Sequence, residues 1–132
     1  PTITPNVSLH PQQMGNPLGD YLASLQRLEP LDVDDVLPAH EHAFTDLRGR
    51  LREIVHHHEE RLDEMVQIIG DEHKTAYQVA SEVVWTTGRL QDFSHWMRRA
   101  ALSETLAHLE YAVQEGRLHQ VRDNGLVRFK KA

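Results

Sequence analysis

The stretch from Asp46 to Gly70 places the strongest constraint on the fold, because its pattern is that of one long amphipathic helix. Asp46 is a favourable N-cap, and Gly70 is a favourable stop. About 23 helical residues correspond to a rod of about 35 Å. Its apolar stripe, spaced at three and four, is made by Leu47, Leu51, Ile54, Val55, His58, Leu62, Met65, Val66 and Ile69. A chain of 132 residues can bury one modest core, or form one small domain with an appendage that packs against something else.

The sequence after Gly70 predicts two further helical regions and a hairpin. Thr75 is the expected cap of a helix that turns Ala76, Val79, Ala80, Val83 and Val84 inward, with Trp85 closing its end. Helical spacing resumes from Phe93 to the stop at Gly116, either as one helix or as two that meet near Ser103. Asp123-Asn124-Gly125 then joins two strands, 118–122 and 126–130. Three helices followed by a hairpin are typical of a winged helix, so the fold class predicted for residues 46–132 is mainly α (α+β) and winged-helix-like.

The sequence before Asp46 predicts less regular structure. Residues 1–13 contain Pro1, Pro5 and Pro11 and are expected to be irregular. A helix is predicted to begin at Asn16-Pro17, to carry an apolar face through Leu28, and to end before Pro30. Val36-Leu37 before Pro38 favours a very short buried strand, and site residues often follow such strands. We call residues 36–42 the seam, because the two parts of the chain meet there.

Composition excludes several classes of protein. The chain has no cysteine, which excludes disulfides and thiolate metal sites. Its formal charge of −6 divides into −7 for residues 1–70 and +1 for residues 71–132, which argues against a general polyanion binder. No apolar run approaches the roughly 18 residues that span a bilayer. We therefore expect no membrane association and a cytoplasmic location.

The seam and its surroundings resemble the C-terminal portion of the metallo-β-lactamase-fold hydrolases, in which a helix precedes a strand that ends in a Pro-Gly-His-Gly-like motif. The downstream part is similar to the winged-helix extension of the β-lactamase-like branch of that family. The matching residues are Gly15-Asn16-Pro17-Leu18, Ser24-Leu25, Val36 to His40, Thr75-Ala76, Glu104 to Leu109, Glu115-Gly116-Arg117 and the hairpin. The resemblance implies a remnant of an αββα catalytic domain in residues 1–45, joined to the helical domain 46–132.

The resemblance also implies a function. His40 corresponds to the last histidine of a dinuclear zinc site, and zinc activates water for attack on an ester, thioester, lactone or phosphodiester. The main metal motif of the family, His-x-His-x-Asp-His, is absent from these 132 residues. We therefore expect an upstream catalytic half of the same protein as the partner, and no activity from the fragment alone. Ala39 and Glu41 replace the two glycines of the family motif, which permit positive φ.

The other histidines are weaker candidates. In extended backbone His42 faces away from His40. His56, His57 and His58 diverge around a helix and do not converge on one ion. We interpret His56 and His57 as surface partners of Glu60 and Glu53, and His58 as a core residue. His108 is interpreted as structural too. Tyr21 and Trp96 are candidate substrate contacts that the sequence does not rank.

The alternative is a free-standing winged-helix module that binds nucleic acid or forms a homodimer through the long helix. The helix before Gly116 carries Glu104, Glu110 and Glu115 from Ser103 onward, which is a poor surface for phosphates. Basic residues of the hairpin offer contacts to a nucleic-acid backbone: Arg122, Arg128, Lys130 and Lys131.

Overall fold

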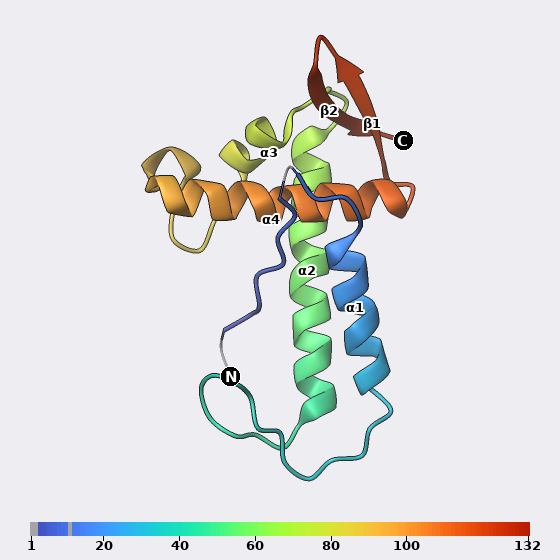
Figure 1. Cartoon of the computed structure of the whole chain (residues 1–132), viewed down its shortest axis with the longest axis vertical. Coiled ribbons are helices and arrows are strands. Elements are labelled where there is room, and N and C mark those ends of the chain that lie inside the picture. Colours follow the sequence, from blue (N-terminus) through green and yellow to red (C-terminus); the bar gives the residue numbers. More distant parts are fainter. Residues whose placement is uncertain (1–2, 11) are drawn as a thin grey trace.

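A long helix, α2 (Leu47–Ile69), runs through the molecule and is crossed by a second long helix, α4 (His95–Gln114) (Figure 1). The computed structural model describes residues 3–10 and 12–132. Pro1 and Pro11, two of the prolines behind the predicted irregular segment, lie outside the described residues. The other elements are α1 (Pro17–Leu28), α3 (Ala76–Glu82), the short 3₁₀ helix η1 (Leu90–Asp92), and the strands β1 (Leu118–Asp123) and β2 (Leu126–Lys131).

Local capping accounts for where the first two helices begin. The Asn16 side chain accepts a hydrogen bond from the Gly19 amide at 3.0 Å, and the Asp46 side chain accepts one from the Gly49 amide at 2.8 Å. Gly70 ends α2 with φ of 55°, a backbone conformation that favours glycine. The predicted helix bounds at Asn16, Asp46 and Gly70 are confirmed.

Two separate clusters of buried side chains lie along α2. The lower cluster joins α1 to the N-terminal half of α2 through Leu25, Leu51 and Ile54. The upper cluster joins the C-terminal half of α2 to α3, α4 and the hairpin. It includes Leu62, Met65, Ile69, Val79, Val83, Leu90, Leu109, Leu118 and Phe129. The predicted stripe is therefore buried, but by different partners at its two ends.

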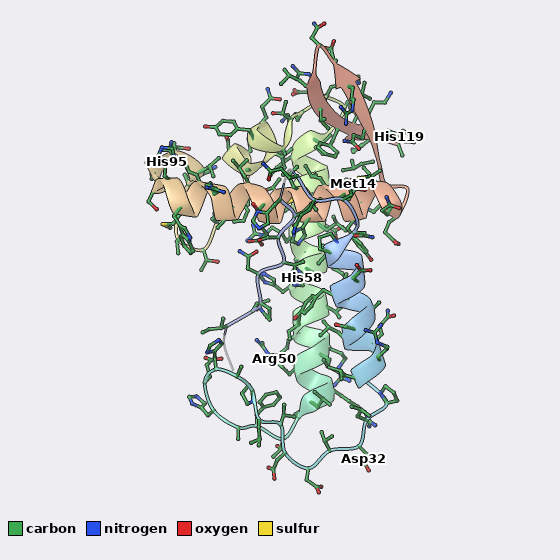
Figure 2. All side chains as sticks on the ribbon, viewed as in Figure 1. Met14, Asp32, Arg50, His58, His95 and His119 are labelled. Atoms are coloured by element: carbon green, nitrogen blue, oxygen red, sulfur yellow. The ribbon has the colours of Figure 1, made fainter. Side chains whose placement is uncertain are left out.

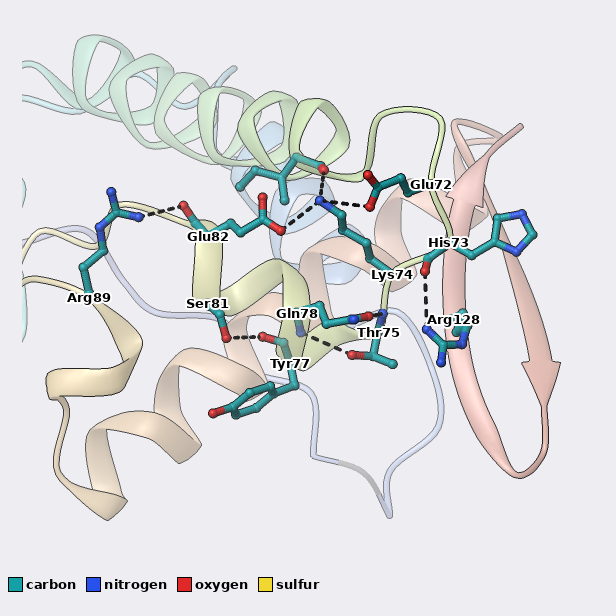
Figure 3. Close-up of polar contacts among 11 residues, drawn as sticks. Glu72, His73, Lys74, Thr75, Tyr77, Gln78, Ser81, Glu82, Arg89 and Arg128 are labelled. Atoms are coloured by element: carbon teal, nitrogen blue, oxygen red, sulfur yellow. Dashed lines mark hydrogen bonds and ion pairs between the residues drawn. The ribbon is translucent and has the colours of Figure 1, made fainter.

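The hairpin is built as the Asn-Gly signal predicted. Asn124 and Gly125 have φ of 48° and 78°, and they form a two-residue loop between antiparallel strands in which Asp123 pairs with Leu126. Lys74, just before α3, forms an additional antiparallel bridge with Phe129, with N···O distances of 3.0 and 2.7 Å. Thr75 then caps α3 in a capping box with Gln78 (Figure 3). The chain is thus mainly helical with an antiparallel hairpin.

Two expectations differ from the structure, and one open alternative is decided by it. Val84 was predicted to face inward but is 61% exposed, because α3 ends at Glu82 and Val83 adopts an extended backbone that turns its neighbour outward. The region after Phe93 is one continuous helix capped by Ser94, and Ser103 lies buried within it. The predicted buried strand at Val36-Leu37 is wrong: Val36 forms one isolated bridge with Phe44, and Leu37 is 82% exposed. Among the described residues, no helix combines the length and apolar character needed to cross a bilayer.

Candidate functional site

The seam forms a loop that is fixed at both ends. The Val36 and Phe44 amides and carbonyls bond to each other at 2.7 and 3.1 Å, which closes the loop at its base. The Glu41 carboxylate accepts a hydrogen bond from the Ile3 amide at 3.3 Å, and Arg50 of α2 donates to the Ile3 carbonyl at 2.6 Å. Figure 2 shows Arg50 on the lower half of α2, near this loop. The loop, the N-terminal segment and α2 therefore hold one another in place.

His40 lies exposed on this loop. Its neighbour Glu41 has φ of 66°, a conformation that non-glycine residues rarely adopt. Within residues 3–10 and 12–132, no three His, Cys, Asp or Glu side chains gather in a way that could hold a metal ion. An accessible imidazole suits a metal ligand, but a single imidazole is not a complete donor set.

The run His56-His57-His58 is divided among three environments. His56 is exposed and pairs with Glu60 at 3.2 Å, as predicted. His57 is half-buried and places its ring edge-on against His58, with ring centroids 5.5 Å apart, while Glu53, its expected partner, pairs with Arg50 at 3.1 Å. His58 is only 2% exposed, so the prediction of a core histidine is confirmed.

A buried pair of histidines links α2 to α4, and sequence reasoning did not find this pairing. His108 is fully buried, and its Nδ1 lies 2.9 Å from the Glu104 carbonyl oxygen. Because a carbonyl only accepts, His108 Nδ1 carries the proton and its Nε2 is an acceptor. His58 Nδ1, 3.2 Å away, must then donate to His108 Nε2. The signal available in the sequence was that both histidines interrupt apolar helix faces.

Burial keeps this pair neutral. Desolvation lowers the pKa of His58 to about 4, with smaller contributions from His57 and Arg61. Desolvation likewise lowers the pKa of His108 to about 4, although the hydrogen bond to Glu104 opposes the shift. The tautomer assignment leaves His58 Nε2 as a buried acceptor without a partner among the described residues. The pair is a structural contact that cannot take up a proton at neutral pH.

A cleft of about 420 Å³ lies beside this pair, between the N-terminal segment, α2, the turn after α3 and α4. Arg61 lies in its wall with its guanidinium 4.9 Å from the centre of the Trp85 ring. Burial lowers the pKa of His57 and raises the pKa of Glu104, so both groups are shifted towards their neutral forms. We call this space the Arg61 cleft; Trp96 lines it and Tyr21 does not.

No family model matches the sequence, and no curated protein matches it either. Solved structures do match, and two of them cover nearly the whole chain. A β-lactamase domain protein from Burkholderia ambifaria has a TM-score of 0.84 and 31% identity, over 96% of this chain. A metallo-β-lactamase family protein from Thermus thermophilus has a TM-score of 0.76 and 33% identity, over 99% of this chain. The structural neighbours of the chain are metallo-β-lactamase-fold proteins.

The chain spans 37% and 38% of the lengths of these two proteins. The match confirms the resemblance indicated by the sequence and is consistent with a C-terminal portion of the metallo-β-lactamase fold. The family name of the second neighbour refers to a metal, whereas the described residues of this chain form no metal-binding group by themselves.

Proposed function

We propose that the chain is the C-terminal portion of a metal-dependent hydrolase of the metallo-β-lactamase superfamily, and that His40 supplies one ligand of its zinc site. The main observation behind this proposal is how much of each chain the matches cover: nearly all of this chain aligns with just over a third of each neighbour. In such a hydrolase the remaining ligands come from an upstream half of the same protein. The substrate is then an ester, thioester, lactone or phosphodiester.

The geometry of the seam supports the role of His40. The loop is closed at its base by the Val36–Phe44 bridge and held from the side by Ile3, so its backbone is well fixed. Glu41 adopts a positive φ although it replaces a glycine of the family motif, so the backbone conformation that a glycine would favour is kept. A neutral imidazole is a good zinc ligand, and bound zinc would supply an activated water.

The helical domain, residues 46–132, is proposed to shape or cover the active site. A winged-helix-like arrangement is supported by the order α2, α3, α4, hairpin and by the Lys74–Phe129 bridge, which adds a third short strand position. Two connections run from the seam to this domain. One is α2 itself, and the other is the N-terminal segment, which contacts Glu41 through Ile3 and α4 through a bond from the Leu9 amide to the Ser103 carbonyl at 2.9 Å.

The test is metal content and hydrolysis in a longer protein that contains an upstream half. His40→Ala is expected to lower bound zinc and to reduce kcat/KM at least a hundredfold, because a lost ligand disrupts the activated water. His42→Ala is the matched control, since it is exposed on the same loop and is expected to change neither quantity. Unchanged activity after His40→Ala, or the absence of bound metal in the longer protein, would contradict the proposal.

A further inference from the structure

The Arg61 cleft has mostly apolar walls with a few polar groups. Trp85, Phe93, Met97 and Ala100 line it together with Trp96, which is 77% exposed. A tryptophan with so much exposed ring contributes little to the core of the chain, yet it adds apolar contact area to a bound molecule. The indole N–H of Trp85 is already satisfied by the Ala80 carbonyl at 3.0 Å, so its ring serves the cleft as an apolar surface.

Arg61 provides the main polar feature of the cleft. Its side chain is 11% exposed and is held by Glu64 at 2.8 Å and by the Val84 carbonyl at 3.4 Å. Its Nε–H is buried and has no acceptor among the described residues. A buried donor without an acceptor is unfavourable, so a ligand whose acceptor reaches this N–H after a shift of the Arg61 side chain gains from the contact.

The charge of the cleft suits a small amphiphile better than a polyanion. The charge of Arg61 is offset by Glu64, and Glu104 lies in the same wall. His57, whose pKa is lowered, adds no positive charge at neutral pH. Repeated phosphates need clustered cations, which this cleft does not provide in its described residues.

The N-terminal segment connects the cleft to the seam. Ile3 contacts Glu41, the residue after His40, while Thr4, Pro5 and Asn6 line the cleft. Residues 4–6 directly follow Ile3 and span at most about 10 Å, so the cleft begins close to the seam contact. A substrate hydrolysed at a metal that His40 helps to hold can therefore reach the cleft with a tail of moderate length.

We infer that the Arg61 cleft is the subsite for the non-reacting part of the substrate, and that the substrate is an amphiphilic ester or thioester. Its apolar chain packs against Trp96 and Trp85, and an acceptor along that chain bonds to Arg61. This inference rests on the proposed function for the reacting end, whereas binding in the cleft is independent of the metal.

Octanoate is a suitable probe, because it combines an apolar chain with an acceptor. Both tryptophans of the chain line the cleft, so their fluorescence reports binding directly. Titration of the 132-residue chain with octanoate is expected to give a saturable change, and acetate is expected to give none. Trp96→Ser should weaken octanoate binding about fivefold or more, since it removes apolar contact. Leu126→Ser, which alters an exposed apolar side chain on the hairpin, should leave it unchanged.

A linear octanoate response, or equal effects of Trp96→Ser and Leu126→Ser, would overturn the inference. Arg61→Lys keeps the charge but loses the Nε donor, and it should weaken octanoate binding while circular dichroism shows an intact fold. In the longer protein, octanoate should still bind; if it does not, the cleft is a packing surface for the upstream half and the inference fails.

Hydrolysis separates this inference from the proposed function. In the longer protein, Trp96→Ser should raise KM for an octanoyl thioester and leave kcat/KM for the matching acetyl thioester unchanged. His40→Ala should abolish hydrolysis of both thioesters while octanoate binding persists. If only the Trp96→Ser result fails, the subsite is contradicted. If only the His40→Ala result fails, the zinc-ligand role of His40 is contradicted.

Discussion

Glu41, in the seam, has an unfavourable backbone conformation. Its φ of 66° lies in the left-handed region, which costs a residue with a Cβ about 1–2 kcal/mol. Its carboxylate contact with Ile3 recovers part of that cost. Backbone strain of this kind persists where the surrounding structure determines the conformation, and it is common at functional sites. The strain therefore supports a functional role for the loop that carries His40.

Glycine and alanine at position 41 test this strain. Both variants lose the Ile3 contact, but only Glu41→Gly removes the Cβ that opposes positive φ. Glu41→Gly is expected to be more stable than Glu41→Ala by about 1 kcal/mol in urea unfolding. The same two substitutions at Glu59, which is exposed within α2, should give the opposite order by about 1 kcal/mol. If the same substitution, glycine or alanine, were the more stable one at both positions, backbone strain at Glu41 would be contradicted.

The His58–His108 pair predicts a pH dependence of stability. Both histidines have a folded pKa of about 4, against 6.5 ordinarily. Between these values the unfolded chain binds more protons than the folded one, so the free energy of unfolding falls as the pH drops from 6.5 towards 4. Above pH 6.5 the contribution is fully present. The loss over this window is a few kcal/mol, at about 1.4 kcal/mol per pKa unit for a single group.

Urea unfolding at about pH 7 and about pH 5 measures this dependence. The double variant His58→Gln, His108→Gln removes both titrating groups and should flatten the decline in stability. His119→Gln, at an exposed position on β1, should leave the decline as it is in the parent chain. A decline unchanged by the double variant would show that the pair is not the source.

At the scale of single elements, α4 shows which local signals in the sequence were decisive. Helical spacing predicted the region but left open whether it is one helix or two that meet near Ser103. The structure uses Ser94, whose hydroxyl accepts a hydrogen bond from the Met97 amide at 3.3 Å. Ser103 instead lies within the helix at 7% exposed. The apolar pattern is compatible with a break at Ser103 and with a continuous helix, so the sequence alone did not decide between them.

Alanine substitution distinguishes the two serines. Ser94→Ala should cost about 1 kcal/mol, because it removes an N-cap. Ser103→Ala should change stability by less than about 0.5 kcal/mol, because serine inside a helix has a lower propensity than alanine and its hydroxyl caps nothing. Urea unfolding of the two variants provides the comparison. A larger loss from Ser103→Ala would indicate a break in α4 at that position.

The sequence predicted the elements better than their surroundings. Caps and turns at Asn16, Asp46, Thr75 and Asn124-Gly125 depend on neighbouring residues, and all of them were located correctly. Val84 and Leu37 were predicted to be buried, yet both are exposed, because burial depends on what else packs nearby. The same reason applies to the candidate site: His40 was proposed from a local motif, whereas the Arg61 cleft is assembled from segments far apart in the sequence and has no local signal.

At the scale of the whole molecule, α2 connects two cores of unequal size. The upper cluster includes 14 buried residues from α2, α3, α4, the hairpin and the segments between them. The lower cluster has three, Leu25, Leu51 and Ile54, and depends on α1. In Figure 1, α1 lies beside the lower half of α2, away from the hairpin. The proposed boundary between residues 45 and 46 therefore separates α1 from the face of α2 that it covers.

Removal of residues 1–45 tests that boundary. The remaining chain, 46–132, keeps every member of the upper cluster and should still fold there. The N-terminal half of α2 loses the cover of Tyr21, Leu22 and Leu25, and a helical segment of about 12 residues is marginal by itself in water. Amide exchange should therefore stay slow at 62–69 and become fast at 47–55, with a gradient along one continuous helix.

Leu25→Ala in the full chain provides a graded control. It removes one contact of the lower cluster, at a cost of about 2–4 kcal/mol, and should speed exchange at 47–55 while leaving 62–69 nearly unchanged. Equal acceleration throughout α2 would show instead that the chain unfolds as one unit and that residue 45 is no folding boundary. The difference matters for the seam, because Arg50 in the lower half of α2 bonds to Ile3, which in turn contacts Glu41. If that half depends on α1, then the placement of His40 depends on residues 1–45 rather than on the helical domain.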